Sequence, residues 1–357
     1  MTTTTLSVII PTLNEADQLP LLLGDLVSQR GCALEIFVAD GGSTDLTRLC
    51  AKKFNAYCIT AERGRGRQMN AAARISTGDY LLFLHADSRI EDGSLLARAV
   101  RALIEEIAVS GQDSVAGHFS VHFVRTGRAN ARAYRYAEEK TAFNRPGTTN
   151  GDQGLLLTRS FFNRLGGFDE SMPFLEDQRI AEKIRVQGQW STLPGRLSTS
   201  ARRFESEGFH RRYTLMSMIM GLYSIEEDSF FSRAPHVYRV QHDTGKLLLT
   251  PFFLVIRQLM REEWGFCGTI RVFYRLGHYI RKNSWQMFYF FDVWARPLLG
   301  PGRYPFLNFH DRIVAPLTDF RLCNALTGMF CFIWFMGILA PLYRYLDGGK
   351  NETGAVG

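Results

Sequence analysis

The chain has 357 residues, a formal net charge of +7 and an isoelectric point near 9.1. This length exceeds one typical domain, and a hydrophobic content of 46% suffices for a substantial core. The positive charge favours anionic partners, such as nucleotide diphosphates or an anionic membrane surface. The sequence has no nucleic-acid-binding motif, so we expect no nucleic acid partner. Six scattered cysteines without a CxxC pair argue against zinc and fit a reducing compartment.

The N-terminal part, from residue 6 to about 115, alternates short apolar runs with stretches of helical spacing. The apolar runs do not alternate with polar residues, which indicates strands buried on both faces of a parallel sheet. Helices are expected after Asn14-Glu15, after Ser43-Thr44-Asp45 and over Asp92–Ile107. The basic segment Glu62–Arg74, interrupted by two glycines, is interpreted as a loop. This alternation predicts a layered α/β domain.

Polar side chains follow three of these predicted strands. Asn14, Asp40 and Asp87 are expected to line one crevice, because ligands bind beyond the carboxyl ends of parallel strands. Asp87 offers the oxygen ligands that Mg²⁺ or Mn²⁺ prefers, with phosphate oxygens completing the shell. Asp40 can accept a base N–H or a ribose hydroxyl. The alternatives are a turn or helix cap for Asp87 and an Asx-turn for Asp40.

Two further groups of charged residues suggest chemistry. Arg63, Arg65 and Arg67 can donate bidentate hydrogen bonds to a diphosphate, or they form a solvated basic surface. Glu176-Asp177 begins a predicted helix, whose dipole alone would explain two acids there. An aspartate at this place can also act as general base toward an acceptor hydroxyl.

A loop and a strand precede this helix. Residues 144–154 have the composition of a loop, in which the polar side chains of Asn150, Asp152 and Gln153 are expected to face a ligand. Strands are expected over Val115–Val124 and Leu155–Thr158.

The C-terminal third is aromatic and basic. Leu322 to Tyr343 runs without a charge, which predicts a membrane span, an interfacial helix or a buried helix. We therefore divide the chain into a catalytic domain at 1–240 and a helical, membrane-associating extension at 241–357. The N-terminus lacks the features of a signal peptide, so the catalytic domain is expected to be cytoplasmic.

Five segments in order resemble the family 2 glycosyltransferases, which have the GT-A fold, a mainly parallel sheet flanked by helices. They are Val8–Glu15, Val38–Asp45, Gly78–Asp87, Gly166–Asp169 and Glu176–Asp177. The variants His85-Ala86-Asp87 and Gly151-Asp152-Gln153 are most similar to a bacterial subfamily of selenodomain-associated transferases. The resemblance covers roughly residues 6 to 240.

The resemblance implies an inverting transfer of a sugar from a UDP- or GDP-sugar donor, with Mg²⁺ or Mn²⁺. It implies that Asp87 binds the metal and that Asp177, beside Glu176, is the catalytic base. Asp152 and Gln153 are then expected to face the donor or acceptor sugar. The donor site implied by the family comprises Pro11, Thr12, Asn14 and Glu15 around the nucleoside, Asp40 at the base, and Arg63, Arg67 and Asn70 beside the donor. Membrane-attached members of the family act on lipids, which makes a lipid-linked acceptor the expected partner.

Two departures from the family pattern stand out. His85 occupies a position that is usually Asp, and Gly41 replaces a second acid next to Asp40. A noncatalytic scaffold that works through the C-terminal region is therefore an alternative. A sugar-1-phosphate nucleotidyltransferase would need a glycine-rich basic loop near residue 11, which the chain lacks.

Overall fold

The computed structural model describes residues 5–172, 174–241, 247–300 and 302–348, which form two compact units, 1–201 and 202–357. Each unit is described by itself. The first unit ends at residue 201, whereas the sequence analysis expects the catalytic domain to end at 240. A compact unit is not the same as a catalytic domain, so the expected boundary at 240 stays a prediction.

The first unit alternates strands and helices. Its strands are β1 Thr5–Thr12, β2 Ala33–Asp40, β3 Tyr57–Thr60, β4 Tyr80–Phe83, β5 Ser88–Arg89, β6 Val115–Val124, β7 Leu155–Thr158 and β8 Gln189–Ser200. Its helices are α1 Leu19–Val27, α2 Thr47–Lys53, α3 Arg65–Ile75, α4 Leu95–Ser110, α5 Ala131–Lys140, the 3₁₀ turn η1 Gly151–Gln153, α6 Arg159–Arg164 and α7 Glu176–Gln187.

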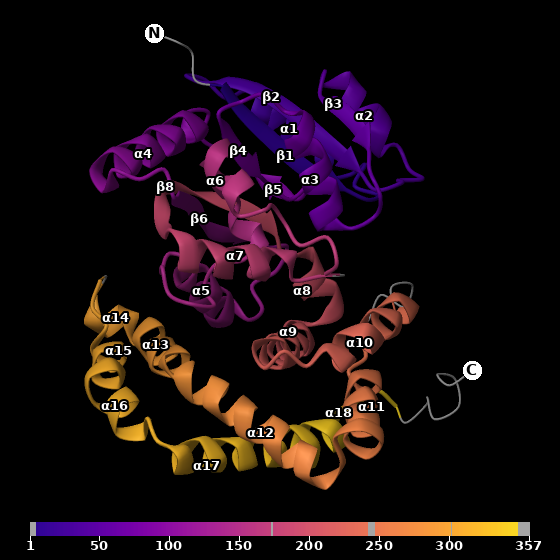
Figure 1. Cartoon of the computed structure of the whole chain (residues 1–357), viewed down its shortest axis with the longest axis vertical. Helices are drawn as coiled ribbons and strands as arrows, with labels where there is room; N and C mark the ends of the chain where they lie inside the picture. The colour runs from indigo at the N-terminus through magenta and orange to yellow at the C-terminus, as the bar shows by residue number, and fades with distance from the viewer. Residues whose placement is uncertain (1–4, 173, 242–246, 301, 349–357) are drawn as a thin grey trace. The chain divides into compact units, whose positions relative to one another are not determined.

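The strands form one mixed sheet in the order β3-β2-β1-β4-β7-β6-β8-β5. Figure 1 shows the strands of the first unit with helices around them. The predicted parallel pairing holds for β1 with β2 and β4, for β2 with β3, and for β6 with β8. Strand β7 runs antiparallel to β4 and β6, and β5 runs antiparallel to β8. The parallel half therefore brings the ends of β1, β2 and β4 to one edge.

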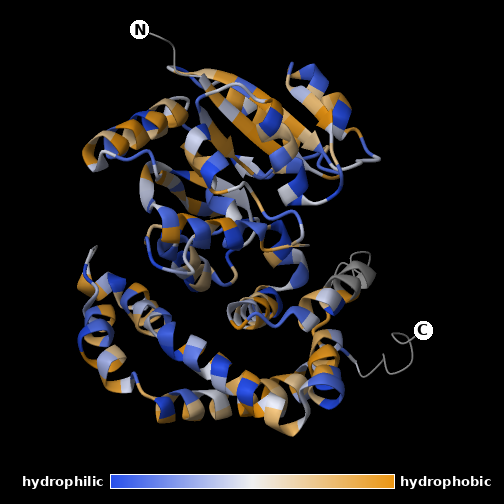
Figure 2. Ribbon diagram, in the orientation of Figure 1, coloured by the Kyte–Doolittle hydropathy of each residue, from blue (hydrophilic) through white to orange (hydrophobic). Residues whose placement is uncertain are grey.

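Helices cover both faces of the sheet. On one face α1, α2 and α4 bury apolar side chains against Val8, Val38 and Leu82. On the other face α3, α6 and α7 pack on Ile9 and Phe83. Successive side chains of β1 pack into the hydrophobic cores on opposite faces of the sheet. Because both faces are covered, the strand is apolar without alternation (Figure 2).

The segment interpreted as a basic loop is in fact mostly helical, so that interpretation is wrong. Helix α3 begins at Arg65, directly after Gly64, whose φ of 138° is accessible to glycine. Gly66 does not interrupt the helix. A Cβ at Gly66 would lie 2.9 Å from the carbonyl oxygen of Asp169, so glycine is required there for close packing.

The regular elements that the structure describes in the second unit are all helices. Its elements are α8 Arg202–Glu207, α9 Phe209–Ser224, α10 Asp228–Gln241, α11 Thr250–Leu259, η2 Met260–Trp264, α12 Gly265–Lys282, α13 Trp285–Trp294, α14 Arg296–Leu299, α15 Pro305–Phe309, η3 His310–Val314, α16 Ala315–Thr318, α17 Arg321–Phe332, η4 Ile333–Leu339 and α18 Ala340–Leu346. The segments η2, η3 and η4 are π-helical.

The last three elements join into one 26-residue helix, Arg321–Leu346, which contains the predicted apolar stretch. Its most apolar 18-residue window has a mean hydropathy of 1.9, so the helix is long and apolar enough to cross a membrane, and only 17% of that window is buried. Length and composition alone leave open how this helix meets a bilayer.

Candidate functional site

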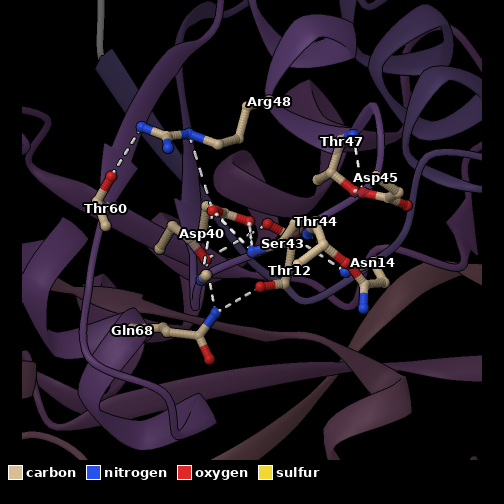
Figure 3. Close-up of polar contacts among 12 residues, drawn as sticks. Thr12, Asn14, Asp40, Ser43, Thr44, Asp45, Thr47, Arg48, Thr60 and Gln68 are labelled. Atoms are coloured by element: carbon tan, nitrogen blue, oxygen red, sulfur yellow. Dashed lines mark hydrogen bonds and ion pairs between the residues drawn. The ribbon is translucent and has the colours of Figure 1, made fainter.

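The first half of the site lies where β1 and β2 end side by side. Thr12 pairs with Asp40 in the sheet register, so the loops that follow the two strands begin at the same edge. Gln68 of α3 closes this edge from one side, because its amide donates to the carbonyl oxygens of Thr12 at 2.8 Å and Ala39 at 2.7 Å (Figure 3). Gln68 is 3% exposed and was not predicted from the sequence.

The carboxylate of Asp40 is completely buried. It accepts hydrogen bonds from the backbone N–H groups of Gly42 at 3.3 Å and Ser43 at 3.1 Å, and Arg48 lies 3.9 Å away (Figure 3). This is the Asx-turn that the sequence analysis left as an alternative. The turn shapes the loop after β2, and the expected contact of Asp40 with a base stays a prediction.

The loops after β1 and β2 are tied together by short polar side chains. Asn14, with a φ of 55°, donates its backbone N–H to Ser43 Oγ at 2.9 Å and accepts from the N–H of Thr44 at 2.9 Å. The N–H of Glu15 donates to Thr47 Oγ1 at 2.8 Å. Asn14 is exposed at this rim, while Pro11 and Thr12 are buried in β1.

The second half of the site joins the end of β4 to the loop before β7. The imidazole Nδ1 of His85 lies 2.9 Å from Oδ1 of Asp152. Burial opposes the charged imidazole, but the hydrogen bond to Asp152 and the negative charges of Asp152 and Asp87 together outweigh burial and raise the pKa of His85. The neighbouring Gln153 is fully buried, with its side chain bonded to Asn150 N at 2.8 Å and Thr141 O at 2.9 Å. Asp152 thus lies against His85, and the buried side chain of Gln153 holds the same loop through its hydrogen bonds.

The first turn of α7 contributes Asp177, with each carboxylate oxygen held by the backbone. Oδ2 accepts from the N–H of Gly151 at 2.8 Å, and Oδ1 accepts from the N–H of Gln178 at 2.9 Å. The preceding Leu175 has a φ of 70°, a left-handed conformation that is costly for a residue with a side chain. The backbone here is thus constrained where Asp177 is presented.

Gly151 lies between Asp177 and His85 with no room for a side chain. A Cβ at this position would be 2.7 Å from His85 Nε2 and 3.2 Å from Asp177 Oδ2. A small cavity opens beside these three residues, and Phe83 and Trp190 form part of its apolar wall. The carboxylate of Asp177 therefore borders space that a ligand group can enter.

Glu176 has a different environment from its neighbour Asp177. It is 2% exposed, and its Oε1 lies 2.6 Å from Nε of Arg65 at the start of α3. Partial desolvation opposes the charge of Arg65, whose side chain is 41% exposed, but the carboxylates of Glu176, Asp177 and Asp152 together outweigh it and raise the pKa of Arg65. The pair joins α3 to α7 directly beside Asp177, the expected catalytic base.

Asp87 lies two residues after His85 and is half-buried. Within the part of the chain that the structure describes, its carboxylate makes no hydrogen bond or ion pair. Nor do three His, Cys, Asp or Glu side chains of the described residues gather into a group that would hold a metal by themselves. Asp87 is thus a carboxylate available for an external ligand.

The three residues expected beside the donor have different surroundings. Arg63 is exposed just before α3. Arg67 pairs with Glu62 and donates to the carbonyl of Glu170 at 3.2 Å. Asn70 is 7% exposed, and its amide bonds Phe168 and Glu170 in the turn before α7. The geometry gives Asn70 a structural role and leaves Arg63 the most accessible of the three.

Comparisons with known proteins agree with this architecture. The family model described as "Glycosyl transferase family 2" matches residues 7–166. A PGL/p-HBAD biosynthesis glycosyltransferase of Mycobacterium tuberculosis is 38% identical over 107 residues, which cover 28% of this chain and 41% of that protein. The succinoglycan biosynthesis protein ExoA of Rhizobium meliloti is 27% identical over 210 residues, which cover 54% of this chain and 62% of ExoA.

Two solved structures align with most of the chain at low sequence identity. S. aureus TarS in complex with UDP aligns with a TM-score of 0.46 and 16% identity, covering 93% of this chain and 92% of that one. A mannosyltransferase from Pyrobaculum calidifontis, in complex with GDP-Man and Mn²⁺, aligns with a TM-score of 0.45 and 20% identity, covering 97% and 88%.

Residues 7–166 therefore match the glycosyl transferase family 2 model, as the sequence motifs predicted. They lie within the first unit, whose mixed sheet is covered by helices on both faces. The family match and the named relatives support a transferase. The narrower resemblance to selenodomain-associated transferases stays a prediction.

Proposed function

We propose that the chain is an inverting, metal-dependent glycosyltransferase. It moves a sugar from a UDP- or GDP-sugar to an acceptor hydroxyl or phosphate, with a lipid-linked molecule as acceptor. The observation that carries the proposal is Asp177, whose carboxylate is fixed by two backbone N–H groups at the border of a cavity beside His85. The family match supports the class of reaction.

Asp177 is the proposed general base. With a hydroxyl acceptor, a carboxylate oxygen of Asp177 takes the proton as the acceptor oxygen attacks the anomeric carbon. The bond from that carbon to the donor phosphate breaks, and the nucleoside diphosphate leaves with the electron pair. One displacement from the opposite face inverts the anomeric configuration. Glu176 is not available for the same task, because it is buried and paired with Arg65.

The residues present fit a divalent cation at Asp87. A single available carboxylate suits Mg²⁺ or Mn²⁺, which takes its remaining ligands from substrate phosphates and water. When bound, the ion would neutralise the charge that develops on the leaving diphosphate. The protein's part is to hold Asp87 at the end of β4, on the side where β1 and β2 also end.

The proposed nucleoside site is the rim formed by the loops after β1 and β2. Pro11 and Thr12 lead to this rim, Asn14 and Glu15 form it, and the buried Asp40 fixes the opposing turn. Exposed Arg63 lies before α3 and can turn toward a diphosphate. Arg67 has partners of its own and would have to exchange them to bind the donor.

The acceptor site is proposed around Asp152, the residue that follows Gly151. Asp152 is 45% exposed and is oriented by His85. Its carboxylate can accept hydrogen bonds from sugar hydroxyls. The apolar C-terminal helix supports an acceptor that carries a lipid and a cytoplasmic catalytic domain attached to the membrane.

The experiment is a nucleoside diphosphate release assay with UDP- and GDP-sugars, Mn²⁺ and a lipid acceptor extract. Asp177→Asn is expected to lower kcat by about 10²–10⁴-fold with donor binding retained. Asp17→Asn, at an exposed position in the same unit, is the matched control and keeps full turnover. Full turnover of Asp177→Asn would contradict the proposal, and no turnover of the unaltered chain with any donor would favour the scaffold.

A further inference from the structure

The apolar helix Arg321–Leu346 is fastened along its length to other helices of the second unit. Gly277 of α12 and Gly328 of α17 meet so closely that a Cβ at Gly277 would lie 2.1 Å from the carbonyl oxygen of Asn324. Further along, Phe273 packs edge-on against Phe332 with ring centroids 5.0 Å apart. The two helices therefore form one closely packed pair.

Polar contacts fix the beginning of this helix. Arg281 of α12 is 8% exposed, donates to Oδ1 of Asn324 at 2.7 Å and pairs with Asp319 at 2.5 Å. Asn324 is 7% exposed, so its amide lies inside the packed interface. Loss of either partner would leave a buried polar group without a hydrogen bond.

Polar contacts also fix the end of the helix. Asp347, directly after α18, pairs with Arg211 of α9 and accepts from Thr250 N at 3.0 Å and Thr250 Oγ1 at 2.7 Å. The guanidinium of Arg211 also lies 5.2 Å from the ring centre of Tyr343. Both ends of the helix are thus attached to the same helical unit.

If Arg321–Leu346 spanned a bilayer with α12 still packed against it, the charged side chains of α12 would also have to enter the membrane. Over its 18 residues α12 carries Arg271, Arg275, Arg281 and Lys282. A charged side chain near the centre of a bilayer costs about 2.5–3.5 kcal/mol or more. A perpendicular Arg321–Leu346 would either place these charges in hydrocarbon or lose the contacts that join the two helices.

The opposite face of the apolar helix is exposed. Leu322, Leu326, Met329, Phe330, Ile333 and Trp334 are each between 42% and 64% exposed. The buried positions Asn324, Gly328, Cys331 and Ala340 form a separate stripe toward the other helices. An uncovered apolar face of this size marks an interaction surface.

The charges around this face fit an anionic bilayer. Residues 247–348 contain eleven Arg or Lys residues and six Asp or Glu residues. Arg312 and Arg321 are exposed close to the beginning of the apolar helix. Basic residues beside an amphipathic helix attract anionic headgroups and strengthen binding by about 1 kcal/mol each near the surface.

We infer that Arg321–Leu346 lies in the plane of an anionic membrane surface and does not span the bilayer. Its exposed face enters the interface, while α12 keeps its charges at the headgroup level. This inference concerns attachment and does not depend on the proposed transfer reaction. It selects one of the three states that the sequence left open.

The first test is co-sedimentation of the full chain with vesicles of phosphatidylcholine, with and without phosphatidylglycerol. We expect binding that is stronger with phosphatidylglycerol and weakened by salt. Phe330→Ser with Trp334→Ser is expected to lower the partition coefficient at least roughly tenfold. The matched control, Val109→Ser with Val186→Ser, replaces residues that are 87% and 85% exposed in the first unit and leaves binding unchanged.

The second test separates in-plane attachment from a span. The chain is produced with an epitope tag at each end, and sealed inverted vesicles are treated with protease. In-plane attachment predicts that both tags are digested and that alkaline carbonate releases the chain. A protected C-terminal tag with resistance to carbonate would overturn the inference. Failure to bind any vesicle, together with self-association of the purified chain, would overturn it in favour of a second copy.

Discussion

The backbone N–H of Gly151 donates a 2.8 Å hydrogen bond to Oδ2 of Asp177 and thereby joins the loop before β7 to the first turn of α7. The same glycine faces His85, whose Nε2 leaves no space for a Cβ. One residue without a side chain thus sets the distance between the proposed base and the residue that orients Asp152.

Gly151→Ala is expected to lower turnover more than it lowers stability. The new methyl group would displace His85 or Asp177 by several tenths of an ångström, and a small misplacement of a reacting group is costly. We expect kcat to fall about tenfold or more, measured by nucleoside diphosphate release. Gly127→Ala is the control, because a Cβ there meets no atom within 4 Å. Equal kcat values for the two variants would show that Gly151 does not position the site.

The ion pair between Arg65 and Glu176 is expected to couple α3 to α7. Arg65→Met leaves the buried carboxylate of Glu176 without its partner, so unfolding free energy should fall by about 1–3 kcal/mol. The double variant Arg65→Met/Glu176→Gln should recover part of that loss. A double-mutant cycle in urea measures the coupling. Strictly additive effects would mean that the two side chains do not interact in solution.

The buried imidazole of His118 should make the free energy of unfolding depend on pH, whether or not the chain is catalytically active. Burial lowers the pKa of His118 to about 4, below the ordinary value of 6.5. Between these values the unfolded chain binds a proton that the folded chain does not, so stability falls as the pH falls through this window. The loss amounts to roughly 3 kcal/mol across the whole window. His118→Gln should flatten this part of the pH profile of urea unfolding, whereas His210→Gln, at an exposed position, should not.

The strands and helices around the site could be predicted from the sequence, because each depends on a pattern of neighbouring residues. The strands β1, β2 and β4 read as apolar runs, and their polar ends meet at one edge because parallel strands end together. The start of α7 at Glu176 was also predicted, since acids favour a helix N-terminus.

The hydrogen-bond and ion-pair partners of individual side chains could not be predicted, because they lie far away in the sequence. Asn70 bonds Phe168, which lies 98 residues further along the chain, and this contact assigns it to packing. From the sequence, Gly66 is interpreted as a helix breaker. The structure shows that glycine is needed there because the carbonyl oxygen of Asp169 leaves no room for a Cβ. The sequence alone does not distinguish the adjacent acids Glu176 and Asp177. In the structure they differ, because Arg65 forms an ion pair with Glu176.

The most direct test of the account compares donor binding with turnover in Asp87→Ala and Asp177→Asn. Thermal shifts with UDP- and GDP-sugars are recorded with Mn²⁺ and with a chelator, beside the release of nucleoside diphosphate. We predict a metal-dependent shift in the unaltered chain that Asp87→Ala loses together with turnover. Asp177→Asn should keep the shift and lose only turnover. A metal-dependent shift that persists in Asp87→Ala, or turnover that persists in Asp177→Asn, would contradict the roles assigned to these two aspartates.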